Sequence, residues 1–207
     1  MFLQILLIIF SYLLGSVPFG LVIAKRLTGI DPRLAGSHSI GATNVSRLCG
    51  FKYGVATLAC DLLKGTLPVC LALWLNLDPL VVSCIALAAV FGHVCSCFLG
   101  FKGGKAVATT IGVFLPLAFW PLAAASGLCL LLIFLSGFVS LGSLTLVSSL
   151  PLFLLFNGDS QWLALALLLA VLVFFKHREN IARLHQGTEK PWLKSRKQAA
   201  EVTPKDS

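Results

Sequence analysis

Charged side chains are scarce in this 207-residue sequence, where they make up 12 % of all residues. No charged residue occurs between positions 106 and 157. Soluble domains carry about a quarter charged residues, so such a stretch cannot provide a soluble surface. Apolar residues reach 57 %, and the mean hydropathy is +0.93. The scarcity of charge therefore excludes an ordinary soluble domain and predicts an all-α polytopic membrane protein.

Acidic residues are rarer still: 8 stand against 16 lysines and arginines, which gives a net charge of +8. In a soluble protein this excess would suggest a nucleic-acid partner. In a membrane protein it indicates lysines and arginines held on the cytoplasmic side, next to anionic headgroups. We therefore expect contacts with membrane lipids, no nucleic-acid partner and no obligate protein partner.

A paired set of cysteines is also missing, because the sequence has 7, an odd number, mostly within apolar runs. A disulfide framework is not expected, and buried cysteine commonly serves as a small apolar residue. The segment HVCSC at 93–97 offers possible metal ligands, but the second ligand cluster of a structural zinc site is absent from the sequence. We expect neither a metal nor another cofactor.

Three apolar runs in the first half are long enough to cross a hydrocarbon core of about 30 Å. They cover residues 2–23, 53–75 and 80–99. The first run is predicted to be an anchor, because no basic residue precedes it and no cleavage site follows it. Pro18 between Gly15 and Gly20 predicts a kink or close helix packing there. Basic residues at 25, 26 and 33 place the N-terminus outside.

The second half is resolved by a parity argument. Lys105 and the basic cluster at 176–178 are expected on the same face, so an even number of spans separates them. Two spans would be far too long for about 70 residues, whereas four fit. The candidate breaks are Pro121, Gly137 with Gly142, and residues 157–160. The prediction is seven transmembrane helices in a domain at 1–183, with a basic cytoplasmic tail at 184–207.

Four polar clusters fall on the predicted cytoplasmic side. They are GSHSIGATNVSR at 36–47, DLLKG at 61–65, His93 with FKGGK at 101–105, and HRENIAR at 177–183. Irregular polar backbone is tolerated at membrane depth only where it is buried in protein or lines a polar cavity. We therefore expect the segment 36–47, which looks like a loop, to cradle an anion such as a phosphate.

Each cluster also has a purely structural interpretation. Lysines beside two glycines before a helix suit phosphate, although any multispan protein has basic residues on this side. The FKGGK segment is not a Walker A loop, because Leu99 and Ala106 replace the required glycine and hydroxyl residue. The hydroxyls and amide of segment 36–47 could also cap helices, but a twelve-residue stretch this rich in such groups is more than caps need, and Arg47 offers a planar fork suited to phosphate.

Two polar features lie inside predicted spans. Asp61 and Lys64 are three residues apart on one helix face, where they can pair. A buried ionisable residue is a functional-site hypothesis by default, but we favour a structural pair that shapes the cytoplasmic cavity. His93 fits a buried core residue and a polar substrate contact equally well.

Together and in order, these motifs resemble those of the bacterial acyl-phosphate:glycerol-3-phosphate acyltransferases, the PlsY family. The matching segments are GATNxxR (41–47), DxxKG (61–65), GH (92–93) before FKGGK (101–105), and HxxNxxR (177–183). The resemblance implies a seven-helix enzyme of the bacterial inner membrane with its active site facing the cytoplasm. It also implies transfer of a fatty acyl group from acyl phosphate to the 1-hydroxyl of glycerol 3-phosphate, giving lysophosphatidic acid and phosphate.

The resemblance also implies roles for individual residues. The expected catalytic residues are Ser37, Arg47, Lys105 and His177. The expected phosphate-binding residues are Gly41, Thr43, Asn44, His93, Lys102, Gly103, Gly104 and Asn180. One departure is at His38 and Ser39, where the family has glycine and asparagine. This departure bears on the path of the loop rather than on the activity.

Two other classes of protein fit the sequence less well. Acyltransferases that use acyl-CoA or acyl carrier protein rely on a His-x4-Asp motif, and none of the four histidines has an aspartate five positions later. A small anion transporter would also use a basic pocket, but transporters need access from both faces and often show internal repeats. Here the polar clusters fall on one side and no repeat is visible.

Overall fold

The computed structural model describes residues 1–192, and in this part of the chain the secondary structure is helical. The α-helices are α1 (Phe2–Ser16), α2 (Phe19–Thr28), α3 (Ala42–Cys49), α4 (Phe51–Trp74), α5 (Pro79–Val94), α6 (Val107–Leu117), α7 (Phe119–Ser136), α8 (Val139–Asn157), α9 (Leu163–Lys176) and α10 (Arg178–His185). Two short 3-10 helices, Cys97–Leu99 and Ser160–Trp162, precede α6 and α9. The predicted all-α membrane architecture is confirmed.

Five helical segments of the described chain are long and apolar enough to cross a membrane. They are Phe2–Thr28, Phe51–Trp74, Pro79–Leu99, Phe119–Ser136 and Val139–Asn157. Ser160–Lys176 with Arg178–His185, bent by 61°, makes a sixth candidate. The remaining apolar helix is α6, which at 11 residues reaches only ~16 Å. Seven apolar segments thus occupy the expected positions, but six at most meet the length criterion, so the seven-span count stays a prediction.

The predicted interruption near Pro18 is present as a break between α1 and α2. Helix α1 ends at Ser16, and the backbone of Val17 is extended (φ −59°, ψ 119°). Gly15 allows α1 to pack directly on α5, because a Cβ there would meet the carbonyl oxygen of Ala89. Small residues at such crossings bring membrane helices close together.

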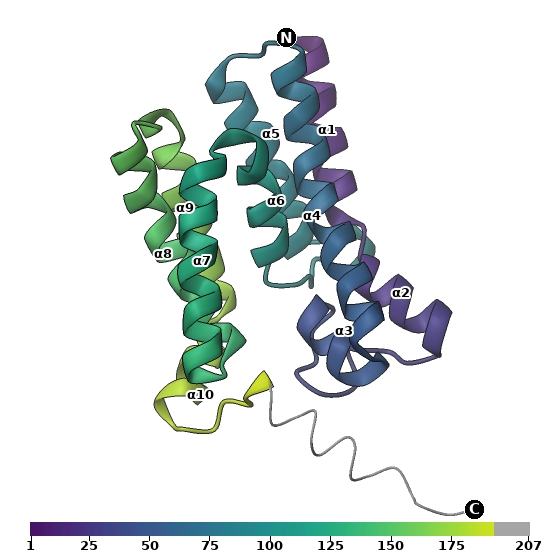
Figure 1. The fold of residues 1–207 in the computed structure, drawn as a ribbon. Coiled ribbons are helices and arrows are strands. Elements are labelled where there is room, and N and C mark those ends of the chain that lie inside the picture. Colours follow the sequence, from purple (N-terminus) through teal and green to yellow (C-terminus); the bar gives the residue numbers. More distant parts are fainter. Residues whose placement is uncertain (193–207) are drawn as a thin grey trace, which may run out of the picture.

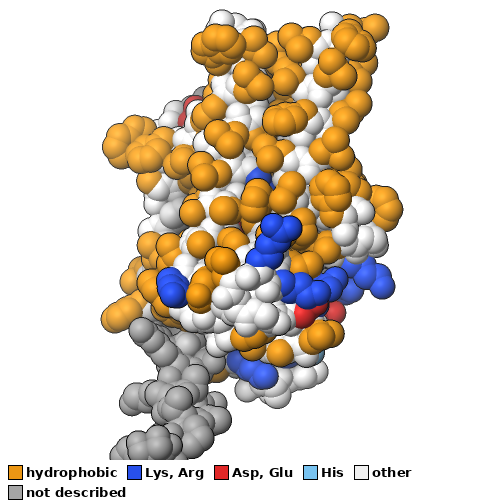
Figure 2. All heavy atoms as spheres, turned by 90° about the vertical axis from the view of Figure 1, so that its right-hand side faces the viewer, with side chains coloured by type: hydrophobic (Ala, Val, Ile, Leu, Met, Phe, Trp, Pro, Cys, Tyr) orange, Lys and Arg blue, Asp and Glu red, His pale blue; other side chains and the backbone are white. Residues whose placement is uncertain are grey.

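The polar segments gather at one end of the bundle. Figure 1 shows α2, α3 and α10 at the lower end, with the N-terminus at the opposite end. Figure 2 shows a mostly apolar upper face, with lysine and arginine side chains concentrated lower down. The fold therefore brings clusters that are up to about 140 residues apart in the sequence to one end of the molecule.

Candidate active site

Half of the polar segment 36–47 is helical, because α3 begins at Ala42 with Gly41 as its N-cap. This corrects the expectation of a loop throughout. Thr43 lies in the first turn of α3, and Ser37 is exposed in the loop before it. Neither side chain forms a hydrogen bond within residues 1–192. Their expected roles therefore stay predictions.

Asn44 organises the loop that precedes α3. Its Nδ2 donates to the carbonyl oxygens of Pro32 at 2.8 Å, Ser39 at 2.8 Å and Ala35 at 3.2 Å. Its Oδ1 accepts from the N–H of Ser37 at 2.9 Å. The side chain is buried, and its amide is fully engaged within the loop. Asn44 therefore shapes the loop, and its amide is not free to bind a phosphate in this structure.

His38 takes the left-handed backbone conformation, with φ of +52°. The resemblance implies glycine at this position, and glycine adopts this conformation without penalty. A left-handed conformation costs a non-glycine residue about 1–2 kcal/mol. His38 regains part of this through Nδ1, which lies 3.0 Å from the carbonyl oxygen of Arg33.

We expect His38→Gly to raise the melting temperature by a few degrees. The change removes the left-handed penalty, while the loss of one exposed hydrogen bond and the added chain freedom offset part of that gain. Activity should stay within about twofold, because the loop already follows this path. Thermal unfolding in detergent measures the effect, and a lower melting temperature would show that the Arg33 contact dominates.

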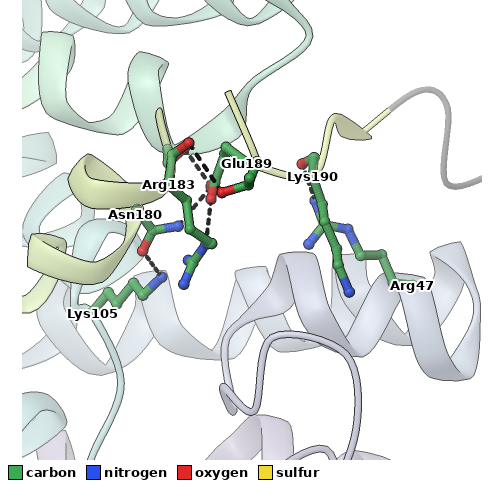
Figure 3. A network of polar contacts seen from close by, with 8 residues as sticks. Arg47, Lys105, Asn180, Arg183, Glu189 and Lys190 are labelled. Carbon is green, nitrogen blue, oxygen red and sulfur yellow. Dashed lines mark hydrogen bonds and ion pairs between the residues drawn. The ribbon is translucent and has the colours of Figure 1, made fainter. Parts of the chain in front are cut away.

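Arg47 projects from the last turn of α3 towards the C-terminal segment (Figure 3). Its Nη2 donates to the carbonyl oxygen of Lys190 at 3.2 Å. Its Nε is buried and has no partner within the described residues. Burial lowers the pKa of Arg47, and the nearby Glu189 opposes this shift. A buried donor without an acceptor is costly, so Arg47 is suited to bind an anion.

The connection 100–106 between α5 and α6, here called the strap, carries Lys102 and Lys105. The N–H groups of Gly103 and Gly104 donate to Val94 and His93 carbonyl oxygens, both at 3.0 Å. A Cβ on Gly104 would meet Nε2 of His93. The two glycines therefore let the strap pack against the end of α5. Their N–H groups, expected to face a phosphate, are already bonded in this structure.

A polar network joins the strap to α10 and α8 (Figure 3). Lys105 Nζ donates to Oδ1 of Asn180. Asn180 Nδ2 donates to Glu189 Oε1, and Arg183 Nε to Glu189 Oε2, both at 2.7 Å. The Ser140 hydroxyl on α8 also donates to Glu189 Oε1 at 2.7 Å. Glu189 is thus the anion around which three donors are arranged, and Asn180 links it to Lys105.

Among the described lysines outside the membrane-spanning helices, Lys105 has the most strongly shifted pKa. Burial lowers its pKa to about 8, and the positive charges of Arg183 and Arg47 act in the same direction. Glu189 and Glu179 oppose the shift. Lys105 and Arg183 belong to the same network, through Asn180 and Glu189, and Arg47 bonds the backbone of Lys190, the residue that follows Glu189.

This pKa predicts a basic limb in the pH profile of kcat/KM, which reports the free enzyme. The ammonium form is needed to hold a phosphate, so kcat/KM should fall about tenfold per pH unit above pH 8. Lys105→Arg should move the basic limb to higher pH, because arginine stays charged. Lys52→Arg, on an exposed position of α4, serves as the control and should leave the limb in place. A limb unchanged in Lys105→Arg would contradict the assignment.

His177, between α9 and α10, is buried and neutral at pH 7. Burial lowers its pKa to about 4, although the contact with Val173 opposes the shift. Its Nδ1 lies 2.8 Å from the carbonyl oxygen of Val173. A carbonyl can only accept a hydrogen bond, so Nδ1 carries the proton and Nε2 is left as an acceptor. His177 Nε2 forms no hydrogen bond among the described residues and can accept one from a ligand.

His93 occupies a different environment, enclosed by helices. Its Nδ1 lies 3.2 Å from the Thr109 hydroxyl on α6, and its ring packs against Gly104. The sequence left two interpretations of His93 open, and this environment fits a buried core residue better than a substrate contact.

Sequence reasoning missed Glu189 and Ser140. Residues 184–207 were expected to form a basic tail, yet Glu189 lies in the network and Trp192 N donates to the Gly137 carbonyl at 2.8 Å. The sequence held one signal for this turn, a glycine at 187 shortly after the helical segment. In the structure Gly187 has a φ of +66° and turns the chain after α10. The rest of the expected tail, 193–207, lies outside the described residues, and the division at 183 stays a prediction.

The described residues offer few alternatives to this network as a site. All seven cysteines are free thiols. No group of three or more His, Cys, Asp or Glu side chains within residues 1–192 is arranged to hold a metal ion. The network and Arg47 bring several charged groups together at the end of the bundle where the polar segments gather (Figure 1).

Comparison with known proteins agrees with the motifs. The family profile "Glycerol-3-phosphate acyltransferase" matches residues 5–187. A glycerol-3-phosphate acyltransferase of Desulfovibrio desulfuricans is 61 % identical over 96 % of this chain and 89 % of its own length. The corresponding protein of Lawsonia intracellularis is 50 % identical over 94 % of this chain and 98 % of its own.

Two solved structures share the fold. Both are of PlsY, described as an integral membrane glycerol 3-phosphate acyltransferase. The glycerol 3-phosphate form has a TM-score of 0.87 at 42 % identity, and the lysophosphatidic acid form 0.85 at 40 %. Each alignment covers 91 % of this chain and 94 % of the other. The resemblance drawn from the motifs is thus confirmed: the chain belongs to the glycerol-3-phosphate acyltransferase family and is an integral membrane acyltransferase of phospholipid biosynthesis.

Proposed function

We propose that the protein transfers a fatty acyl group from acyl phosphate to the 1-hydroxyl of sn-glycerol 3-phosphate, releasing lysophosphatidic acid and inorganic phosphate. The observation that carries this proposal is the placement of Arg47, Lys105 and Arg183 around Glu189 and Lys190 (Figure 3), with the Nε of Arg47 buried and without a partner among residues 1–192. Both substrates carry a phosphate, and a guanidinium fork and an ammonium are suited to such groups.

The chemistry needs little from the protein beyond positioning and charge. Acyl phosphate is a mixed anhydride with a good leaving group. The 1-hydroxyl oxygen attacks the acyl carbon, the bond from that carbon to the phosphate oxygen breaks, and the hydroxyl proton passes to the departing phosphate. Arg47 and Lys105 stabilise the phosphate charge. His177 Nε2 and Ser37 are proposed to orient the attacking hydroxyl.

We further propose seven spans with the N-terminus outside and the C-terminus and active site in the cytoplasm of a bacterial inner membrane. Lys25, Arg47, Lys105 and Arg183 all lie in α2, α3, the strap or α10, at the same end of the bundle. Lysine and arginine on one side indicate the cytoplasmic face. Labelling of single cysteines on either side of intact cells tests this orientation.

The donor is tested with purified protein and radiolabelled glycerol 3-phosphate. Acyl phosphate should give labelled lysophosphatidic acid and an equal amount of inorganic phosphate, whereas acyl-CoA and acyl carrier protein thioesters should give neither. Product from a thioester but not from acyl phosphate would overturn the proposed donor and leave the family assignment intact.

A further inference from the structure

An ion pair that the proposed chemistry does not use lies inside α4. Lys64 Nζ is 2.7 Å from Asp61 Oδ1, and the two side chains are only 1 % and 4 % exposed. Burying such a pair costs free energy, and a protein in which apolar residues of similar volume replace the pair is often equally stable or more stable. The contacts of the pair therefore deserve a functional explanation.

Lys64 reaches the break between α1 and α2. Its Nζ donates to the carbonyl oxygen of Val17 at 3.1 Å and lies 5.9 Å from the centre of the Phe19 ring. This break sets the direction of α2. At Gly20, α2 packs so closely on the loop before α3 that a Cβ would meet the Ile40 carbonyl oxygen. Lys64 thus holds the element against which the loop leading to Arg47 is packed.

Asp61 reaches α5 in the other direction. The same Oδ1 lies 3.7 Å from Nδ1 of His93, which also contacts the Thr109 hydroxyl on α6 at 3.2 Å. The His93 carbonyl accepts from Gly104 N–H, and the ring fills the space beside Gly104. Gly104 immediately precedes Lys105. The orientation of the His93 ring therefore determines where the strap, and with it Lys105, is placed.

We propose that Asp61 and Lys64 are positioning residues of the acyl-transfer site. One buried pair contacts both the α1–α2 break and the histidine that supports the strap. The pair therefore fixes the positions of the segments that carry Arg47 and Lys105 relative to each other. The inference rests on the proposed role of these two cations in binding phosphate. The two can be tested separately: if the proposed function is wrong, the unmodified protein itself lacks the activity, whereas if only the positioning role is wrong, the unmodified protein is active and the variants below keep that activity.

The decisive experiment separates folding from positioning. Lys64→Met alone leaves a buried, unpaired carboxylate, and we expect it to lower both the melting temperature and the activity. The double variant Asp61→Val/Lys64→Met removes both charges and should recover the melting temperature. Its kcat/KM for glycerol 3-phosphate should stay at least about tenfold low, since a misplacement of about 1 Å can cost 10²-fold. Recovery of kcat/KM together with stability would overturn the proposal.

A milder variant tests the His93 side independently. Thr109→Val removes the hydroxyl that holds the His93 ring, and Thr66→Val is the matched control. The Thr66 hydroxyl bonds the Gly112 carbonyl at 2.8 Å across the same α4–α6 contact without touching His93. Both variants should have similar melting temperatures, while only Thr109→Val should raise the KM for glycerol 3-phosphate, by about tenfold. Equal kinetics in the two would overturn the proposal, even if the double variant does not fold.

Discussion

Replacing Arg47 with alanine is expected to lower kcat/KM by about 10³-fold, in the range seen when a charge-stabilising donor is removed from an active site. The guanidinium is partly desolvated, and its buried Nε has no acceptor within the described chain. The loss should appear in kcat as well as in KM, because phosphate charge is redistributed during acyl transfer. Arg47→Lys should recover about tenfold, since lysine restores the charge but not the planar fork.

Stability should move the other way from activity in this variant. Arg47→Ala removes a buried unsatisfied donor, so the melting temperature should be unchanged or slightly higher. Glycerol 3-phosphate should stabilise the unmodified protein but not the variant. Arg33→Ala is the matched control from the preceding loop, because Arg33 pairs with Asp31 on the exposed surface at 2.7 Å. A loss in Arg47→Ala no larger than in this control would contradict the role given to Arg47.

The helix breaks of the second half show what the sequence could predict. Gly137 and Gly158 end α7 and α8 in the left-handed conformation, with φ of +78° and +82°. Both lie at predicted breaks, because glycine adopts this conformation without penalty. The third break falls at Ala118, three residues before the predicted Pro121. Proline is tolerated in the first turn of a helix, so Pro121 sits just inside α7 rather than between helices.

The site shows where local sequence stops being informative. The convergence of Lys105 with Asn180 was predictable, because charge asymmetry places both segments on one face. The role of Asn44 in its loop was not predictable, because an asparagine amide can bind a ligand or organise a loop, and only the fold decides which. Glu189 escaped notice because its role depends on the chain reversing after α10. Its flanking sequence, with lysines downstream, is typical of a solvated tail.

Glu189→Gln is expected to lower kcat/KM by about 10²-fold through misplacement of Asn180 and Arg183. The carboxylate accepts from Ser140 and Asn180 on one oxygen and from Arg183 on the other. A glutamine amide has only one acceptor oxygen, so its NH₂ group must face a donor whichever way it turns. We also expect the melting temperature to fall by several degrees, since a hydrogen bond to a charged group contributes about 1.5–3 kcal/mol.

The ionisation of Glu189 gives a pH test of the same contacts. Burial alone raises the pKa of Glu189, but the bonds from Ser140, Arg183 and Asn180 outweigh this and hold it below its usual value. A carboxyl with a lowered pKa in the folded state stabilises above its unfolded pKa, and this contribution is lost as pH falls through the folded value. The stability difference between the unmodified protein and Glu189→Gln should therefore be full at neutral pH and shrink in acid.

Glu179→Gln separates the positioning effect of Glu189 from its charge. Both glutamates raise the pKa of Lys105, so removing either should move the basic limb of kcat/KM to lower pH. Glu179 is exposed on α10 and bonds none of the network residues. Its variant should keep the full plateau of kcat/KM below the limb, whereas Glu189→Gln should lose about 10²-fold at every pH. If the kcat/KM plateaus of Glu179→Gln and Glu189→Gln were equal, Glu189 would contribute only its negative charge. The hydrogen bonds that Glu189 accepts would then not be required for the reaction.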